Sequence, residues 1–137
     1  MNNQAFFDAL VHTILNNSDD LLTKDNAQTK PAGNQYWGKC YIVSEAIYYY
    51  FGGNLSPYTP HGIRHENTSH WYLVHKSGDI VDYTCLQYET MPDYLLGRGR
   101  GFLPVKAGIS KRSQHFLSRV KEQMNIDAEN NRAGGAQ

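Results

Sequence analysis

Residues 69–84, SHWYLVHKSGDIVDYT, carry the clearest secondary-structure pattern in the chain. An apolar and aromatic run, SHWYLVH, is followed by the turn residues KSGD and then by the β-branched run IVDYT. Two such runs joined by a short turn that contains glycine are typical of a β-hairpin. The sequence therefore predicts two antiparallel strands here, and the rest of the domain can be placed around them.

The length of the turn determines which side chains of this hairpin share a face. A three-residue turn, Lys76–Gly78, pairs His75 with Asp79 and puts its glycine in the left-handed conformation that such turns favour. His70 and Asp82 then lie on one face as diagonal neighbours, within side-chain reach. A two-residue turn would shift the register by one residue and separate the pair. The hairpin thus permits a histidine–aspartate pair but does not require one.

A second pattern lies upstream, in GKCYIVSEAIYYYFGG, residues 38–53. Its apolar residues recur at helical spacing over about 39–51, and the two glycines at its end supply a C-cap. Cys40 falls in the first turn of this predicted helix. A free cysteine often packs as a small buried hydrophobe, whereas a helix N-terminus favours the reactive thiolate. The helix alone leaves both interpretations open.

Two further helices are expected at the ends of the chain. Apolar residues recur at helical spacing over residues 3–16, and again in SKRSQHFLSRVKEQM, residues 110–124. Ser110 is the expected N-cap of the latter. The basic residues after Ser110 stand where a helix dipole prefers acidic ones, which indicates either unoptimised capping or an anion contact. Residues 18–36 are polar, with one proline and one glycine, and predict a loop.

The order of these elements predicts an α+β fold, with N-terminal helices packed on a small antiparallel sheet and a C-terminal helix. GIRHE, residues 62–66, is expected to add a strand, and residues 86–104 predict a long ordered loop. A length of 137 residues is typical of one domain. We expect a single catalytic-type domain over residues 1–124 and a flexible C-terminal tail over residues 125–137.

Cys40, His70 and Asp82 together meet the requirements of cysteine chemistry. The thiol has to lose its proton to a neighbouring base, and that base has to be held in one tautomer. We therefore interpret Cys40 as the nucleophile, His70 as the base and Asp82 as the group that orients it. The oxyanion formed during attack needs hydrogen-bond donors, for which the backbone N–H of Cys40 and the side-chain amides of Asn34 and Gln35 are candidates.

This arrangement resembles the core of the transglutaminase-like and papain-like cysteine enzymes. In that superfamily a cysteine at a helix start is followed by a strand with His-x-Trp or His-Trp, and then by a strand similar to Val-Asp-Pro-Thr. The similarity covers residues 37–84, about a third of the chain, and departs from the pattern at Tyr83, where proline is usual. It implies a papain-like or transglutaminase-like fold and acyl transfer through Cys40, His70 and Asp82. Arylamine acetyltransferases share this logic, and the chain as a whole also resembles small phage-encoded proteins.

Candidate substrate contacts flank the cysteine and the histidine. Trp37 and Trp71 lie close to them in the sequence, and GRGRGFLP alternates glycine with Arg98 and Arg100. Glycines let the backbone approach a ligand, and arginines bind carboxylate or phosphate through paired N–H groups. With Arg64 these residues suit an anionic substrate, unless they form only a solvated turn. An alternative function is therefore a non-catalytic binding module for an anionic small molecule or nucleotide, and a third is a structural or assembly protein.

Composition argues against several other functions. Thirteen basic residues balance thirteen acidic ones, so nucleic acid is an unexpected partner, and no apolar run reaches the roughly 20 residues of a membrane span. Without a recognisable signal peptide, both cysteines are expected to be reduced, in the cytoplasm or, for a phage protein, in the host cytoplasm. His61 and His65 have the spacing of zinc ligands, but the rest of a zinc site is missing. We expect no metal and no cofactor, and a small-molecule, peptide or protein substrate.

Overall fold

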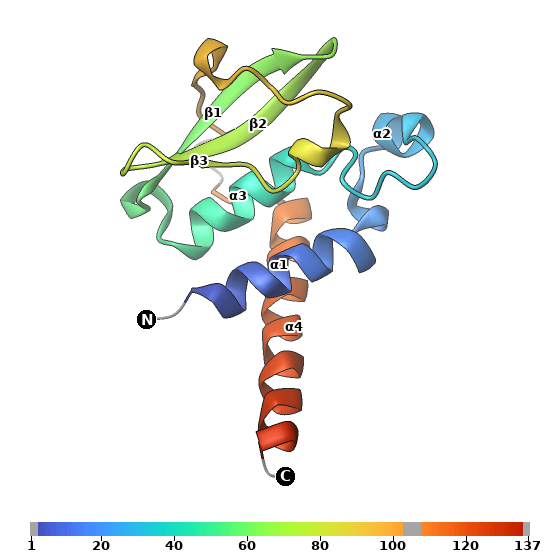
Figure 1. Ribbon diagram of the computed structural model, residues 1–137, viewed down its shortest axis with the longest axis vertical. Helices are drawn as coiled ribbons and strands as arrows, with labels where there is room; N and C mark the ends of the chain where they lie inside the picture. The colour runs from blue at the N-terminus through green and yellow to red at the C-terminus, as the bar shows by residue number, and fades with distance from the viewer. Residues whose placement is uncertain (1–2, 103–107, 136–137) are drawn as a thin grey trace.

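The computed structural model describes residues 3–102 and 108–135, which form a mixed α and β structure. An antiparallel sheet with strand order β3-β2-β1-β4 is one layer, α3 lies beneath it, and α1 and α4 lie beyond α3 (Figure 1). The elements are α1 (Gln4–Asn16), α2 (Lys24–Thr29), α3 (Cys40–Tyr50), β1 (Tyr58–His65), β2 (Thr68–His75), β3 (Ile80–Val81), β4 (Arg98–Gly99), α4 (Lys111–Gly135) and the 3-10 turns η1 (Asp19–Leu21), η2 (Gly53–Leu55), η3 (Cys85–Gln87) and η4 (Tyr94–Leu96). The predicted α+β class is confirmed.

The predicted hairpin is present as β2 and β3, in the register that a three-residue turn gives. Leu73 pairs with Val81, and the N–H of His75 donates to the carbonyl of Asp79 at 2.9 Å. Gly78 has a φ of +95°, a conformation that residues with a Cβ rarely adopt. The side chains that we expected on one face of the hairpin therefore do share a face.

The other strands differ from the sequence pattern in extent. β1 spans Tyr58–His65 and pairs with β2 along its length, so it is longer than the predicted strand at 62–66. Within the predicted loop, Arg98–Gly99 pairs with β1 as the edge strand β4. Leu103 and Pro104 of the same predicted loop lie outside the described residues. β4 is too short to leave a periodic signal, and this is why pattern reasoning does not detect it.

Helix α3 supplies the centre of the core, because it contacts β2 on one side and α4 on the other. Against α1, the ring of Phe6 stacks on that of Tyr50, with centroids 3.9 Å apart. The core residues buried from these four elements include Phe6, Leu10, Ile14, Ile42, Val43, Ala46, Ile47, Trp71, Leu73, Phe116 and Val120. Cys40 thus begins a helix in which seven of the eleven residues are buried.

The segment 18–36 is more ordered than the loop that its composition predicts. It contains η1 and α2, and the Oγ1 of Thr23 caps α2 by accepting the N–H of Asn26 at 3.2 Å. None of the six residues of α2 is buried. A polar helix of this length has no apolar stripe, so the hydrophobic pattern gives no signal for it.

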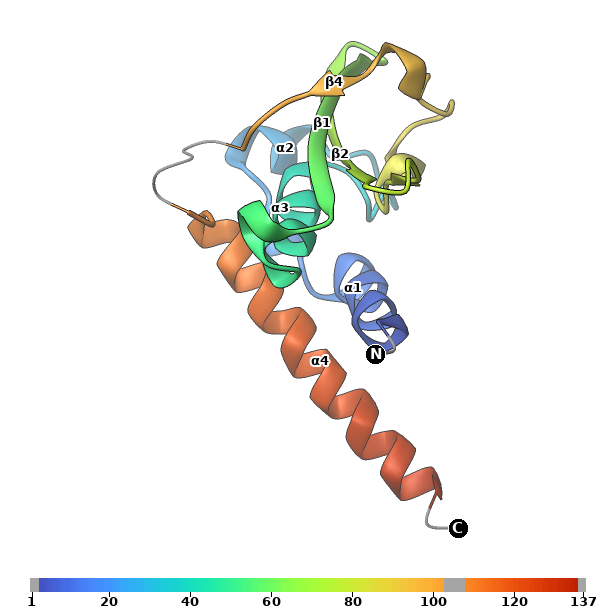
Figure 2. The ribbon, with the colours of Figure 1, turned by 90° about the vertical axis from the view of Figure 1, so that its left-hand side faces the viewer.

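Helix α4 begins where it was predicted but ends later. The Oγ of Ser110 accepts the backbone N–H three residues further along, at 3.3 Å, as expected of an N-cap. The helix then continues to Gly135 and projects beyond α1 (Figure 2), so its end is not at residue 124. Exposed pairs such as Arg132 with Glu129, 3.0 Å apart, support these polar turns. Residues 136–137 of the expected tail lie outside the described residues.

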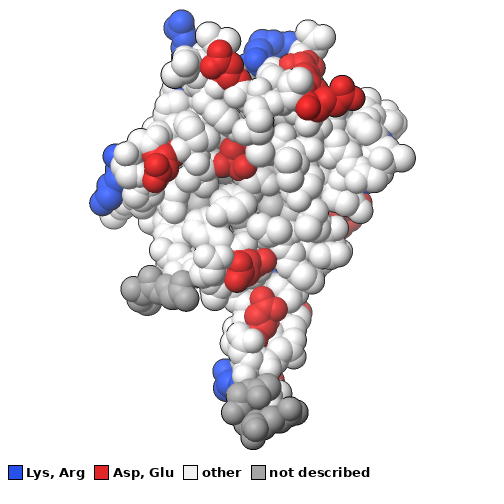
Figure 3. Space-filling model, viewed as in Figure 1, with Lys and Arg blue, Asp and Glu red and all other residues white. Residues whose placement is uncertain are grey.

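None of the helices in the described residues is long and apolar enough to cross a bilayer. On the face drawn in Figure 3, acidic and basic side chains are interspersed among uncharged ones. The zero net charge of the chain is therefore accompanied, on this face, by mixed signs.

We expect Gly97→Ala to destabilise the fold by about 1–3 kcal/mol, the usual cost of overpacking. A Cβ at this position would overlap the hydroxyl of the buried Tyr72. Gly99→Ala is the matched control, because a Cβ at Gly99 meets no heavy atom within 4 Å. Urea unfolding of both variants measures the difference, and equal stabilities would contradict the packing described for Tyr72.

Candidate active site

His70 and Asp82 form a buried pair at the centre of the candidate site. Nε2 of His70 lies 2.6 Å from Oδ2 of Asp82, and the two side chains are 0% and 4% exposed. The imidazole is also enclosed by the rings of Tyr72 and Tyr88, whose centroids are 6.3 and 5.0 Å from its own. These contacts fix the orientation of the imidazole at its polar edge and at its sides.

Asp82 is held by further contacts that also end β3. Its Oδ1 accepts the backbone N–H of Thr84 at 3.2 Å, an Asx-type turn that directs the chain away from β2. Its Oδ2 accepts the hydroxyl of Tyr94 at 2.6 Å. Burial and the bond to Asp82 raise the pKa of Tyr94, which therefore remains a donor at physiological pH. β3 leaves β2 after two residue pairs, before it reaches the position of His70.

Cys40 is the first residue of α3, is buried, and faces His70 with its thiol. Burial lowers the pKa of His70, but hydrogen bonds to Asp82 and Cys40 and the charges of both groups outweigh it and raise the value to about 9. Asp82 occupies Nε2 of the ring, and Nε2 of Gln87 lies 3.4 Å from Nδ1, on the side that remains for the thiol of Cys40. With a pKa of about 9, His70 is protonated at neutral pH, and the sulfur of Cys40 lies next to a positive charge.

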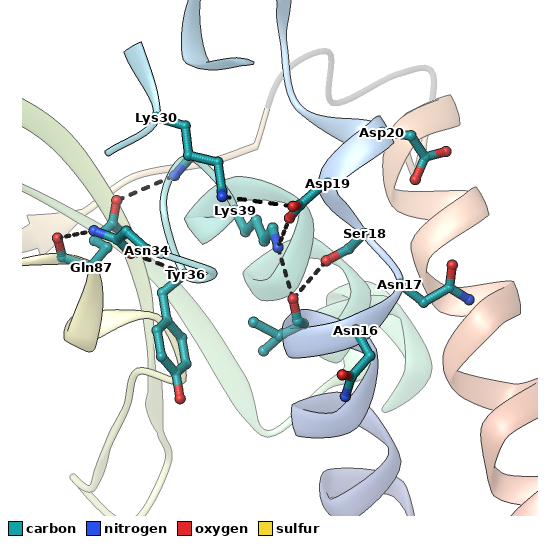
Figure 4. A network of polar contacts seen from close by, with 12 residues as sticks. Asn16, Asn17, Ser18, Asp19, Asp20, Lys30, Asn34, Tyr36, Lys39 and Gln87 are labelled. Atoms are coloured by element: carbon teal, nitrogen blue, oxygen red, sulfur yellow. Dashed lines mark hydrogen bonds and ion pairs between the residues drawn. The ribbon is translucent and has the colours of Figure 1, made fainter. Parts of the chain in front are cut away.

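The residue before Cys40 fixes where α3 begins. Lys39 is fully buried, and its Nζ donates to the carbonyl of Ile14 and to Oδ1 of Asp19, both at 2.7 Å (Figure 4). Burial lowers the pKa of Lys39, and the bond to Asp19 opposes this. The carbonyl of Ile14 lies in the last turn of α1, where carbonyl groups have no N–H partner within the helix. The helix dipole also favours a cation at this end. The lysine thus ties the end of α1 to the start of α3.

Cys40 lies at a cavity of about 210 Å³. Trp37 and Trp71, both expected from the sequence to contact a substrate, line this cavity together with Arg112 from α4. Nε of Arg112 donates to the carbonyl of Leu21 at 2.7 Å, which fixes the guanidinium plane. Burial lowers the pKa of Arg112, which nevertheless stays charged at neutral pH. The cavity therefore combines a thiol, two indole rings and a positive charge.

The side-chain amides that reach this cavity, those of Asn26 and Gln87, are not the two that we expected. Neither Asn34 nor Gln35 lines it, whereas Gln87 does, with Nε2 3.4 Å from Nδ1 of His70. The Oε1 of Gln87 accepts the N–H of Gly38 at 3.4 Å. Asn34 acts one step away, because its Nδ2 donates to the backbone carbonyl of Gln87 at 2.9 Å (Figure 4). The Oε1 of Gln35 is buried and has no hydrogen-bond partner among the described residues.

The three arginines predicted from the sequence lie together, but outside the thiol cavity. Arg64, Arg98 and Arg100 line a second cavity of about 500 Å³ beside β1 and β4. Ser69 lines both cavities. The arginine cavity therefore adjoins the thiol cavity at Ser69 of β2.

The second cysteine and the remaining histidines have other surroundings. Burial and the charge of Asp82 raise the pKa of Cys85, which disfavours its thiolate. Nδ1 of His61 and Nε2 of His65 each lie within hydrogen-bond distance of a backbone carbonyl, at 3.2 and 2.8 Å. In the described part of the chain, no three or more His, Cys, Asp or Glu side chains form a group that could hold a metal ion.

Several site residues were not identified as such from the sequence. Gln87, Tyr88 and Tyr94 come from the irregular segment after Asp82, which has no periodicity that would indicate their direction. Arg112 did leave a signal, because a basic residue in the first turn of a helix opposes the helix dipole. That signal indicated either unoptimised capping or an anion contact, and not a contact with the cavity of a thiol.

Comparisons of the chain with protein-family models, with curated proteins and with solved structures find no match. The resemblance to transglutaminase-like and papain-like enzymes therefore rests on the motif in residues 37–84 alone.

We expect the imidazole of His70 to titrate near pH 9, and Asp82→Asn to move this titration to lower pH. The raised pKa depends on the carboxylate, so its removal leaves burial as the stronger influence. Histidine NMR spectra recorded between pH 5 and 10 measure both midpoints, with a His70→Gln variant to assign the signal. A His70 signal with the same midpoint in the wild type and in Asp82→Asn would contradict the pairing.

Proposed function

We propose that this protein is a cysteine-nucleophile acyl-transfer enzyme of the papain-like or transglutaminase-like kind. The observation that carries the proposal is the buried imidazole of His70, which is bonded to Asp82 at Nε2 and faces the thiol of Cys40. A merely structural histidine needs a partner at one nitrogen, and this one also meets a thiol at the edge of a cavity. Cys40, His70 and Asp82 therefore have the roles of nucleophile, base and orienting group.

The arrangement accounts for each step of acyl transfer. His70 holds the proton that Cys40 has lost, and the thiolate sulfur attacks the carbonyl carbon of an amide, peptide or thioester. The C–S bond forms as His70 returns the proton to the leaving amine or thiol, which departs and leaves a thioester. Water or an amine then attacks the thioester, giving up a proton to His70 and releasing Cys40. Asp82 keeps the imidazole in one tautomer throughout.

Donors for the developing oxyanion are present at the thiol. The first N–H groups of α3 have no intrahelical acceptor, and that of Cys40 is among them. Gln87 lines the same cavity, and its Nε2, which also donates to the carbonyl of Thr84 at 3.2 Å, is the second donor under this proposal. A backbone N–H and a side-chain amide are the kinds of donor that preorganised oxyanion sites use.

The substrate under this proposal is a small molecule or a peptide segment, since the cavity at Cys40 is only about 210 Å³ in volume. The cytoplasm suits such an enzyme because its thiol has to stay reduced. Hydrolase, deamidase and transferase activities share the thioester and differ only in what attacks it. A non-catalytic binding module on the same scaffold is the competing proposal, and it requires no reactive thiol.

Reaction with p-nitrophenyl acetate tests the proposal. We expect a burst of nitrophenolate and one acetyl group on Cys40, seen by mass spectrometry of the tryptic peptide. Cys40→Ser should abolish the acetyl group on this peptide. His70→Gln should slow the burst at pH 7 at least about tenfold, because a thiol without an imidazolium partner is mostly protonated there.

Cys85→Ser is the matched control and should retain the burst, because burial and Asp82 raise the pKa of that thiol. Iodoacetamide labelling of the same set gives a second readout that needs no acyl group. If Cys40 reacts with both reagents no faster than Cys85, the thiol is not activated and the binding module is the better explanation.

A further inference from the structure

Three arginines gather on the sheet face that also bears Trp71. Residues paired across an antiparallel ladder point to the same face, and Arg64 pairs with Ser69 while Arg98 pairs with Gly62, which is itself opposite Trp71. Arg100 follows on the same segment. These side chains line the cavity of about 500 Å³ described above.

The positive charges of this cavity have no carboxylate partner in the described residues. None of the ion pairs found there involves Arg64, Arg98 or Arg100, and no Asp or Glu lines the cavity. Arg64 donates instead to the carbonyl of Asn67 at 3.3 Å. Like charges brought together without a counter-charge repel one another, so the electrostatic interaction among these arginines does not stabilise the fold.

Arg100 is held in place rather than free in solvent. Its Cζ lies 4.3 Å from the centroid of the Trp71 ring, and its Nη1 donates to Oγ of Ser69 at 2.8 Å. The side chain crosses β1 at Gly62, where a Cβ would come within 2.9 Å of its Cδ. Cation–π contact and a fixed hydrogen bond orient the guanidinium, which lowers the entropy lost when it binds an anion.

The arginine cavity and the thiol cavity share a wall. Ser69 lines both, and the indole of Trp71 lines the thiol cavity and carries Arg100. Arg112 adds a further positive charge inside the thiol cavity itself. A molecule with its reacting carbonyl at Cys40 can therefore extend past Ser69 into positively charged surroundings.

We propose that the substrate of the Cys40 site carries an oxyanion group, carboxylate or phosphate, that binds to Arg64, Arg98 and Arg100. This inference rests on the proposed acyl-transfer function, because only an enzyme has a substrate. The anion site itself does not depend on catalysis. Arginine forks match the geometry of both oxyanions, and the cavity volume allows a small anionic group with its adjoining atoms.

Two disulfide reagents of opposite character test the site in a Cys85→Ser background. The anionic 5,5′-dithiobis(2-nitrobenzoate) and the neutral 4,4′-dithiodipyridine both react with the thiolate of Cys40 by thiol–disulfide exchange and release a coloured thiol. We expect the double variant Arg64→Gln/Arg98→Gln to slow the anionic reagent about tenfold, because it loses electrostatic attraction. The neutral reagent should react at an unchanged rate.

Matched variants separate the site from general charge effects. Arg132→Gln removes one positive charge from the exposed end of α4 and should change neither rate. Arg100→Lys keeps the charge but not the planar fork, and should lose part of the preference for the anionic reagent. An unchanged ratio of the two rates in the double variant would overturn the anion site.

Binding measured without the thiol keeps this inference distinct from the proposed function. Calorimetric titration of Cys40→Ala with pyrophosphate and with glutarate reports the site directly, and the stronger ligand distinguishes phosphate from carboxylate. Loss of that binding in the double arginine variant supports the site even if Cys40 proves unreactive. A fast neutral reagent combined with no binding of either anion overturns the site and leaves the acyl-transfer proposal standing.

Discussion

The buried contact between His70 and Asp82 constrains the end of β3 and the segment that follows it. An imidazole and a carboxylate can leave water together only if their polar atoms find partners in the protein. Asp82 meets this condition with His70, Thr84 and the hydroxyl of Tyr94. The same contacts end β3 and hold the segment after it against the sheet. The path of this irregular segment, which also carries Gln87 to the cavity, is therefore a consequence of burying one pair.

The start of α3 is fixed by a second, separate group of contacts. Lys39 ties it to the last turn of α1, and the N–H of Gly38 reaches Gln87. At φ +74°, Gly38 allows the chain to turn sharply into the helix. Five residues into α3, the buried Glu45 accepts the N–H of Ser110 at 2.9 Å and so sets where α4 begins. The thiol and Arg112 thus owe their positions to contacts that join segments distant in the chain.

Local chemistry explains which features could be predicted from the sequence. The register of the hairpin follows from the three-residue turn that ends in Gly78, and it brings His70 and Asp82 to one face before any tertiary contact is considered. The position of Cys40 follows from helical periodicity. Gln87 could not be placed in this way, because its direction depends on where an irregular segment packs. The expected amides of Asn34 and Gln35 were upstream of Cys40, and only the tertiary structure shows that Asn34 is used to hold Gln87.

The buried charges and the clustered arginines differ in how the fold accounts for them. The buried Lys39 and His70 each have a carboxylate partner that offsets the cost of desolvation, Asp19 for Lys39 and Asp82 for His70. The arginines beside Trp71 are exposed and have no such carboxylate among the described residues, although the chain contains as many acidic as basic residues. Packing and turn formation explain the buried charges, but they do not explain the clustered arginines. A cluster of like charges without a carboxylate partner, in a cavity that adjoins the thiol cavity at Ser69, is most simply explained by an anion that arrives from outside.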